Sequence, residues 1–348
     1  MQTLLMRWAL AVHVSVGAAL IADQVAAQAP APLKITVGNL SSISDAGIYI
    51  ADKKGYFRDE GLAVTLTTFR SGADMVPSLG TGQIDVGAGS PSAGLYNAIA
   101  RGLKIKIVAD KAYSPAGYAA TKLIIRKDLI DSGRVKVLAD LKGLKIATNA
   151  PGVSNQAMLN TGLVAAGLKF ADIATIDLPF PEHPIALRNK AVDGGATIEP
   201  FATMAVEQGV ALTLKRDDEI DLDHQHACIL YAEAFSRDKP DAALGFMRAY
   251  IKGVRFYNGA LADGRLAGPN AEEVISILAE YTAVKDRALL AKITPTGLHP
   301  DGRVNVASLQ RDLDFYASLG LIQGKLAVRD MVDTSYTDTA VKALGPWK

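Results

Sequence analysis

The sequence predicts an α/β fold made of two lobes that are joined by a two-strand hinge. Three observations predict it. Strand and helix patterns alternate over residues 33–109, a second alternating series covers residues 123–214, and the chain then returns through residues 229–231 to a mostly helical C-terminal part. Alternation of strands and helices is typical of parallel sheets covered by helices on both faces. We therefore expect each series to form one lobe.

The first series opens at residues 33–37, where apolar and polar side chains alternate as they do in a half-buried strand. Pro91 in the first turn of a helical pattern and Gly102 just past its end mark a helix with the usual proline and glycine asymmetry. The other expected strands are 62–69, 84–88 and 105–109, and the expected helices are 45–54, 72–79 and 91–101.

The second series contains a helix that opens at residues 152–154 and is closed by Gly167. Short strands are expected at 123–125, 144–148, 173–178, 195–198 and 211–214, and later helices at 238–258, 271–283 and 306–319.

These patterns divide the chain into an outer lobe and an inserted lobe. We expect residues 33–117 and 230–348 to form lobe 1 and residues 122–224 to form lobe 2, with crossings near 117–122 and 224–231. A cleft between two lobes is the usual position for a small ligand.

The first 29 residues differ from the rest and match a secretory signal peptide. Arg7 is the only early basic side chain, residues 8–21 are mostly apolar, and small residues precede a cut after Ala27. The apolar run is too short for the roughly 20 residues of a spanning helix. We therefore expect residues 1–27 to be a signal peptide. No cysteine lies at the cut, so the exported protein should be soluble in the periplasm and not a lipoprotein.

Composition excludes several classes of protein. Lys and Arg number 37 and Asp and Glu number 36, so the net charge of +1 creates no overall field that would attract nucleic acid or an anionic membrane. The single cysteine, Cys228, excludes an internal disulfide framework and a thiolate metal cluster.

Three expected strand-to-helix turns are rich in hydroxyl groups: residues 39–45, 89–92 and 152–155. Ligands of open α/β sheets lie at such turns, where helix N-termini present free N–H groups. Each turn alone is explained by ordinary helix capping. Three of them facing one cleft favour binding of a small anion or polar group without a matching arginine.

Two catalytic or nucleotide motifs are nearly matched but fail. Residues 87–92 resemble the dinucleotide pattern G-x-G-x-x-G with Asp110 about 20 residues on, but Ser92 replaces the third glycine. The same segment lacks the first glycine of the nucleophile elbow G-x-S-x-G, because Ser90 stands there. We predict neither nucleotide binding nor a hydrolase, although a Ser-His-Asp set from distant positions stays open.

Metal chemistry has one candidate, the sequence His224-Gln225-His226 beside Asp221 and Asp223. Two histidines at i and i+2 on a strand face the same side, and an acidic neighbour could complete a site. The favoured alternative is a solvated connector between the lobes, so we predict no metal and no cofactor.

Two further residues follow strands of lobe 2. His183 lies in a loop from which it could reach the cleft. Glu199 follows the strand 195–198, and its carboxylate either faces the cleft or stabilises a helix N-terminus.

An ordered set of short motifs resembles a known family. Residues 51–62, ADKKGYFRDEGL, are similar to the opening of periplasmic solute-binding proteins of ABC importers, and residues 79–87, 141–147, 186–194 and 199–201 follow the same pattern. The group that they resemble most is the nitrate, sulfonate and taurine binding proteins together with the thiamine-precursor (pyrimidine) binding proteins. The resemblance covers nearly all of the chain after the expected signal peptide.

The resemblance implies a type II periplasmic binding protein fold and a protein that is not an enzyme. It implies a monomer that captures a small organic ligand (a sulfonate, a taurine-like molecule, a carboxylate or a pyrimidine) between its lobes and delivers it to the permease of an ABC importer. With His183, the ligand-binding residues that it implies are Ser41, Ser42, Asp45, Arg70, Ser71, Ser90, Pro91, Ser92, Tyr118, Ser154, Asn155, Glu199 and Phe201.

The sequence departs from relatives that stack a tryptophan on the ligand, because Trp8 lies in the leader and Trp347 near the terminus. Tyr118 or Phe201 would have to supply an aromatic face. Two other classes stay open. A sensor module for a receptor would share the fold, whereas a pyrimidine synthase of this fold uses a cysteine-rich iron motif that one cysteine cannot supply.

Overall fold

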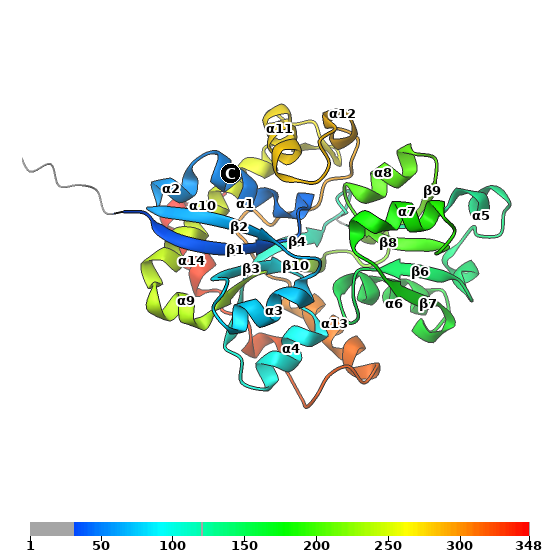
Figure 1. Cartoon of the computed structure of the whole chain (residues 1–348), viewed down its shortest axis with the longest axis horizontal. Coiled ribbons are helices and arrows are strands. Elements are labelled where there is room, and N and C mark those ends of the chain that lie inside the picture. The colour runs from blue at the N-terminus through cyan, green and yellow to red at the C-terminus, as the bar shows by residue number, and fades with distance from the viewer. Residues whose placement is uncertain (1–30, 120, 348) are drawn as a thin grey trace, which may run out of the picture. The chain divides into compact units, whose positions relative to one another are not determined.

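The first of two mixed sheets carries the N-terminal strands and one strand from much later in the chain. The computed structural model describes residues 31–119 and 121–347, so the expected signal peptide lies outside the described residues. The strand order is β2-β1-β3-β10-β4 (Figure 1). The bounds are β1 (Leu33–Asn39), β2 (Leu62–Thr68), β3 (Val86–Gly89), β4 (Ile105–Ser114) and β10 (His224–Ala232).

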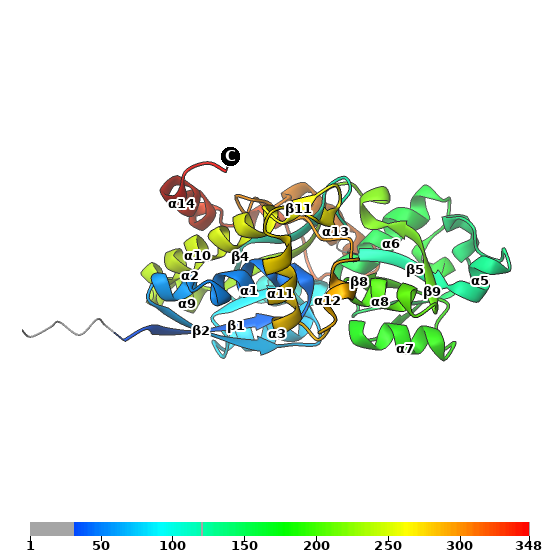
Figure 2. The same cartoon turned by 90° about the horizontal axis from the view of Figure 1, so that it is seen from above.

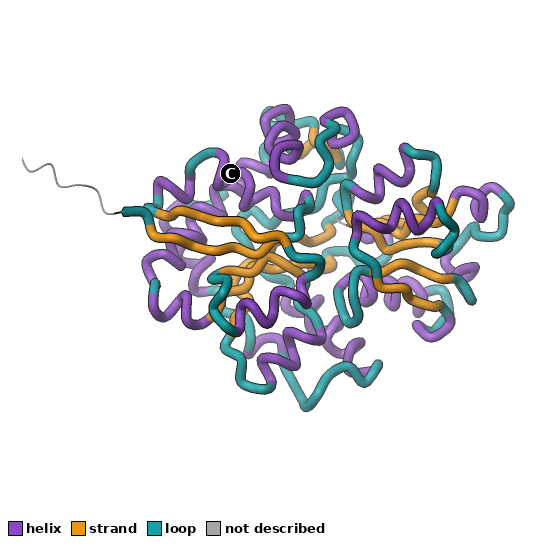
Figure 3. Tube along the Cα trace, in the orientation of Figure 1, coloured by secondary structure: helices purple, strands orange, loops and turns teal. Residues whose placement is uncertain are grey.

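The second sheet is built from the middle of the chain and has the order β7-β6-β8-β5-β9. The strands gather in two separate groups in Figure 3, and the view from above in Figure 2 again places β5, β8 and β9 apart from β1 and β2. The bounds are β5 (Thr121–Arg126), β6 (Lys145–Thr148), β7 (Ala174–Asp177), β8 (Gly194–Ile198) and β9 (Ala211–Arg216).

Both sheets contain antiparallel strands, so the expectation of purely parallel sheets is wrong. β10 lies between β3 and β4 and is antiparallel to both, with His224 paired to Ser114 at the end of β4. β5 is antiparallel to β8 and to β9. The physical reason is the double crossing: a chain that returns at the end of β4 must run back along that strand in the opposite direction.

Helices of the first lobe cover both faces of its sheet. Buried glycines let α1 and α10 approach closely, since a Cβ on Gly253 would collide with the carbonyl oxygen of Gly47. The helices before β10 are α1 (Ala46–Lys53), α2 (Tyr56–Asp59), α3 (Gly72–Gly80) and α4 (Ala93–Ala100). Those after it are α9 (Glu233–Asp238), α10 (Pro240–Asn258), α11 (Ala271–Tyr281), α12 (Arg287–Leu290), α13 (Val306–Ser318) and α14 (Ser335–Leu344).

Among the described residues, no helix has the length and apolar character needed to cross a membrane. The sequence patterns did not predict α12, α14 or the small hairpin of β11 (Leu261–Ala262) and β12 (Arg265–Leu266). These short elements are stabilised by packing against the larger ones. The periodicity of apolar residues in the sequence does not reveal such packing.

The second lobe has two apolar clusters of its own, one centred on Ile146 and Leu163 and the other on Ala147 and Leu187. Adjacent residues of β6 thus enter different clusters, because successive side chains of a strand point to opposite faces of the sheet. Its helices are α5 (Lys127–Asp131), α6 (Ser154–Ala165), α7 (His183–Arg188) and α8 (Phe201–Glu207).

The two lobes touch directly at the N-terminus of α6. Ser90 Oγ accepts from the Ser154 amide at 3.1 Å, and the Ala93 amide donates to the Gly152 carbonyl at 2.8 Å. Gly152 has φ +61°, and a Cβ there would lie 2.6 Å from the Ala93 Cβ. Only glycine therefore fits this contact without displacing the opposite lobe.

Replacing Gly152 with alanine should hold the lobes apart, because the added methyl group occupies the space of Ala93. We expect a larger radius of gyration by small-angle X-ray scattering and a lower melting temperature. Gly167→Ala is the matched control, since Gly167 has φ +76° and no neighbouring atom within 4 Å of the place where its added methyl group would lie. The control should lose stability through backbone strain without expansion, and equal expansion of both variants would contradict this account.

Candidate functional site

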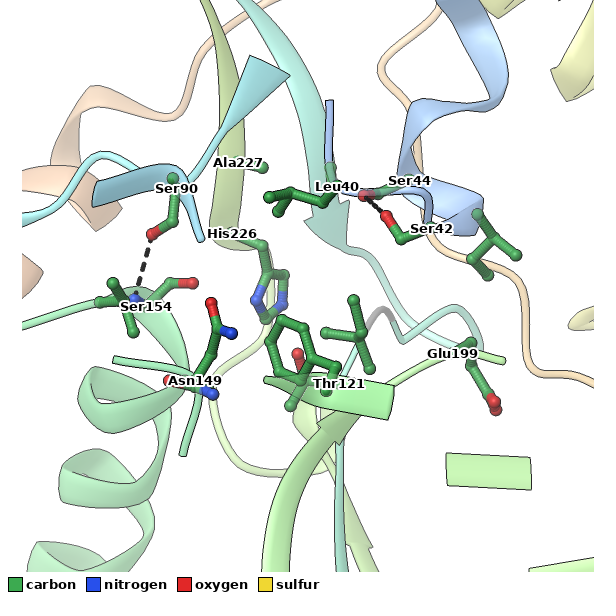
Figure 4. A pocket seen from close by; sticks show the side chains of 17 residues that line it. Leu40, Ser42, Ser44, Ser90, Thr121, Asn149, Ser154, Glu199, His226 and Ala227 are labelled. Carbon is green, nitrogen blue, oxygen red and sulfur yellow. Dashed lines mark hydrogen bonds between the residues drawn. The ribbon is translucent and has the colours of Figure 1, made fainter. Parts of the chain in front are cut away.

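A pocket lies between the two lobes at the ends of their central strands (Figure 4). The space between protein atoms there is about 530 Å³, part of it open to solvent. The first lobe contributes Leu40, Ser42, Ile43, Ser44, Gly72, Ser90, Ala112, His226 and Ala227. The second lobe contributes Thr121, Asn149, Val153, Ser154, Asn155, Phe180, Ile198 and Glu199.

Five of the residues expected from sequence line this pocket together: Ser42, Ser90, Ser154, Asn155 and Glu199. They come from three separate strand-to-helix turns and from the end of β8. Each turn begins a helix, and the strands that precede the turns end at the cleft. The hydroxyl-rich turns are thus brought to one place, as the sequence predicts.

Asn155 has a buried polar atom without a partner in the described pocket lining. The side chain is 2 % exposed, and its Nδ2 donates to the Ala196 carbonyl at 3.2 Å. Its Oδ1 is buried without a hydrogen-bond partner among the described residues. A buried acceptor left unpaired costs about 1–3 kcal/mol, so this atom is suited to accept from an N–H or O–H group of a ligand.

Asp45 does not line the pocket and instead organises the first turn. Its Oδ2 accepts from the amides of Leu40 and Ser42 at 3.2 and 3.1 Å. Its Oδ1 lies 2.7 Å from Lys111 Nζ, and both side chains are fully buried. Lys111 also donates to Ser44 Oγ at 2.9 Å, so this ion pair positions a pocket hydroxyl.

Glu199 lines the pocket, but its carboxylate is directed away from the other lining side chains in Figure 4. Lys122 Nζ lies 2.5 Å from Oε1, and Thr203 donates through its amide at 3.0 Å and its hydroxyl at 2.8 Å. Thr294 of the first lobe donates an amide at 3.3 Å. The carboxylate is therefore already neutralised and bonded, which corresponds to the helix-terminal alternative more than to a free ligand contact.

The remaining residues expected from sequence lie outside the lining. Ser71 and Ser92 are the N-caps of α3 and α4, with side chains that accept from Asp74 and Leu95 amides at 3.2 and 3.1 Å. Ser41 takes a positive φ of 54°, and Arg70 is exposed. Pro91 and Phe201 are buried, and Tyr118 is half-buried in the segment after β4.

His183 is fully buried in the second lobe rather than exposed to the pocket. Its Nε2 donates to the Leu178 carbonyl at 3.0 Å, so its Nδ1 accepts from Thr197 Oγ1 at 2.8 Å. Burial lowers the pKa of this imidazole from 6.5 to about 4. The ring is therefore neutral at pH 7 and acts as a fixed bridge between two backbone segments.

Several lining residues were not expected from sequence, among them Ser44, Thr121, Asn149 and Phe180. His226 was considered only as a metal ligand, yet its ring lies among the pocket side chains in Figure 4. The interpretation of His224-Gln225-His226 as a solvated connector is wrong, because all three residues are buried in β10. The H-x-H spacing and the apolar residues that follow it could have predicted a buried strand at this position.

The pocket lacks a basic group of its own. Among the described lining residues there is no lysine or arginine, and the titratable side chains are Glu199 and His226. The nearby Lys111 and Lys122 are each paired with a buried carboxylate. The wall is otherwise a mixture of apolar side chains with hydroxyl and amide groups, which suits a small organic molecule with a polar end.

Two lobes with a pocket between them define the class of periplasmic binding protein folds. The chain matches the model of the NMT1-like family over residues 28–278 and belongs to that family. It is 25% identical over 272 residues to the putative aliphatic sulfonates-binding protein of Escherichia coli, covering 77% of this chain and 79% of that protein.

Solved structures show the same fold. The nitrate-binding protein of Synechocystis superposes with a TM-score of 0.74 at 17% identity, covering 91% of this chain and 90% of that one. The alkanesulfonate-binding protein of Xanthomonas axonopodis pv. citri, bound to MOPS, gives 0.69 at 18% identity, with 87% and 99% covered. The type II fold expected from the sequence is confirmed.

The buried His183 should make the protein less stable in acid. Its folded-state pKa of about 4 lies below the 6.5 of an exposed histidine, so the unfolded chain binds a proton first as the pH falls. This contribution is present above about pH 6.5 and is lost between pH 6.5 and 4, by about 3 kcal/mol at most.

We expect His183→Gln to remove this part of the pH dependence while keeping a donor for the Leu178 carbonyl. Urea unfolding between pH 8 and 4.5 measures it as the difference in slope between the two proteins. His299→Gln is measured for comparison, because it replaces a histidine that is only partly buried. Identical slopes for wild type and His183→Gln would show that the ring does not titrate as described.

Proposed function

We propose that this chain is an extracytoplasmic solute-binding protein that captures a small organic ligand between its lobes and does not catalyse a reaction. The observation that carries the proposal is the pocket at the lobe boundary, whose walls come from both lobes and contain an unpaired buried acceptor on Asn155. Membership of the NMT1-like family and the similarity to a sulfonates-binding protein support it.

The lining favours an organic ligand over a bare inorganic anion. Leu40, Ile43, Val153, Phe180 and Ile198 supply apolar surface, which a nitrate-sized ion would leave unused. The hydroxyl of Thr121 is a donor for a sulfonate, a carboxylate or a pyrimidine oxygen, whereas the hydroxyls of Ser42 and Ser44 bond to each other and Ser42 also donates to Asp45 Oδ2. Asn155 Oδ1 adds a requirement for a donor on the ligand, which a taurine-like amine or a pyrimidine N–H satisfies.

Delivery to an ABC importer permease is the second part of the proposal. We infer that the ligand-bound chain, exported to the periplasm as a monomer, docks on the permease and raises the ATPase activity of the transporter. Reconstitution with the candidate permease in nanodiscs measures this. Binding to a receptor without any stimulation of ATPase activity would favour the sensor alternative.

A thermal-shift screen tests ligand capture directly. The panel contains alkanesulfonates, taurine, small carboxylates and pyrimidines, with nitrate as the inorganic control. A ligand at 100 times its Kd stabilises the folded protein by about 2.7 kcal/mol, which is a shift of several degrees. We expect a hit among the organic classes. Failure of every organic class, or a shift with nitrate alone, would contradict the proposal.

Asn155→Leu should weaken binding of that hit by about tenfold or more, because the ligand donor then faces an apolar group. Isothermal titration calorimetry measures the change. Asn160→Leu on the same helix is the matched control, since Asn160 lies outside the pocket lining. Equal affinities for the two variants would show that Asn155 does not contact the ligand.

A further inference from the structure

Three possible metal ligands converge behind the pocket wall. Asp217 lies in the short helix η5 (Asp217–Glu219), where the chain returns from the second lobe, and His224 and His226 are alternate residues of β10. One ligand atom from each lies within 4.8 Å of the other two, and all three side chains are buried. His224 and His226 lie together because alternate residues of a strand share one face. Asp217 reaches them from η5, seven residues before His224.

A second carboxylate holds one of the imidazoles in position. His224 Nε2 lies 3.2 Å from Asp312 Oδ2 on α13, while its Nδ1 lies 3.3 Å from both oxygens of Asp217. A histidine that binds a metal through one nitrogen usually donates the other N–H to a carboxylate. Asp312 therefore holds the His224 ring in an orientation that directs Nδ1 toward Asp217.

A neutral oxygen lies beside the same atoms. Ser114 Oγ lies 2.8 Å from His226 Nε2 and 2.9 Å from Asp217 Oδ2. His226 Nε2 is in turn in contact with Asp217. Two imidazole nitrogens, one carboxylate oxygen and one hydroxyl oxygen thus lie close together. This set of donors suits zinc and its neighbours in the first transition series.

The two buried carboxylates of the cluster also favour a bound cation. Asp217 and Asp312 are two buried carboxylates, and the nearby basic side chains are engaged elsewhere, Arg216 with Asp218 and Arg311 with Asp221. Buried carboxylates are costly unless they are paired or coordinate a metal. A divalent cation bound by the two imidazoles and Asp217 would balance both negative charges.

We propose that Asp217, His224 and His226 form a site for one divalent transition metal of the zinc type, with Asp312 as a positioning residue and Ser114 as the neutral fourth donor. The site joins the segment that returns from the second lobe to β10 of the first. Because His226 also lines the pocket, the metal fixes one wall of the ligand site. The proposal does not depend on which ligand the pocket takes.

Metal binding by the purified chain tests the proposal. After treatment with a chelator and dialysis, zinc and cobalt are titrated separately and bound metal is counted by elemental analysis. We expect about one equivalent of zinc per chain, a raised melting temperature and a visible cobalt spectrum of low coordination number. A folded chain that binds no stoichiometric metal would overturn the proposal and leave an ion-pair network only.

Variants locate the metal. Asp217→Asn and His224→Asn should each weaken zinc binding at least tenfold, and Asp312→Asn should weaken it less. His299→Asn is the matched control, because His299 lies outside the cluster and should leave binding unchanged. Undiminished zinc binding by Asp217→Asn and His224→Asn would place the metal elsewhere and overturn the assignment.

X-ray absorption on the zinc-loaded wild-type chain keeps the proposal falsifiable if these variants fail to fold. Scattering typical of two imidazole rings in the zinc shell supports the site. A shell of oxygen ligands alone would overturn it.

Discussion

β10 is the strand on which both lobes depend. It is the strand of the first sheet that lies between β3 and β4, all nine of its residues are buried, and it begins where the chain returns from the second lobe. Its antiparallel direction follows from that return, since the chain reaches the sheet at the end of β4. One strand therefore joins β3 to β4 in the first sheet, leads into the C-terminal helices and brings His226 and Ala227 to the pocket wall.

The pocket owes its chemistry to charges that are neutralised behind its walls. Lys111 with Asp45 and Lys122 with Glu199 are buried ion pairs, one in each lobe. The members of each pair also bond to segments that form the pocket. Lys111 donates to Ser44, and Asp45 accepts from the turn before α1. Glu199 accepts from α8 and from Thr294. Such pairs add little net stability. They leave a wall of hydroxyl, amide and apolar groups without an exposed cation.

The sequence was most informative where structure is local. Alternating apolar residues located most of the strands of the first series, and the hydroxyl-rich turns located Ser42, Ser90, Ser154 and Asn155 in the pocket. The role of Asp45 could not be predicted in this way, because its partner Lys111 lies 66 residues further on and on another element. The same holds for His226, whose surroundings depend on the pairing of β10 with β4. The antiparallel pairs escaped prediction because strand direction depends on where the chain crosses between lobes.

The contact between Ser90 and Ser154 has an energetic consequence for ligand binding. The amide at the start of α6, which could otherwise bind an anion, donates to a side chain of the opposite lobe. Every ligand that needs this amide must compete with a contact that already exists. The apparent affinity is then the intrinsic affinity multiplied by the fraction of molecules in which the lobes have separated. For a ligand bound through this amide, the contacts of Ser90 with Ser154 and of Ala93 with Gly152 together raise the ligand concentration needed for half-saturation.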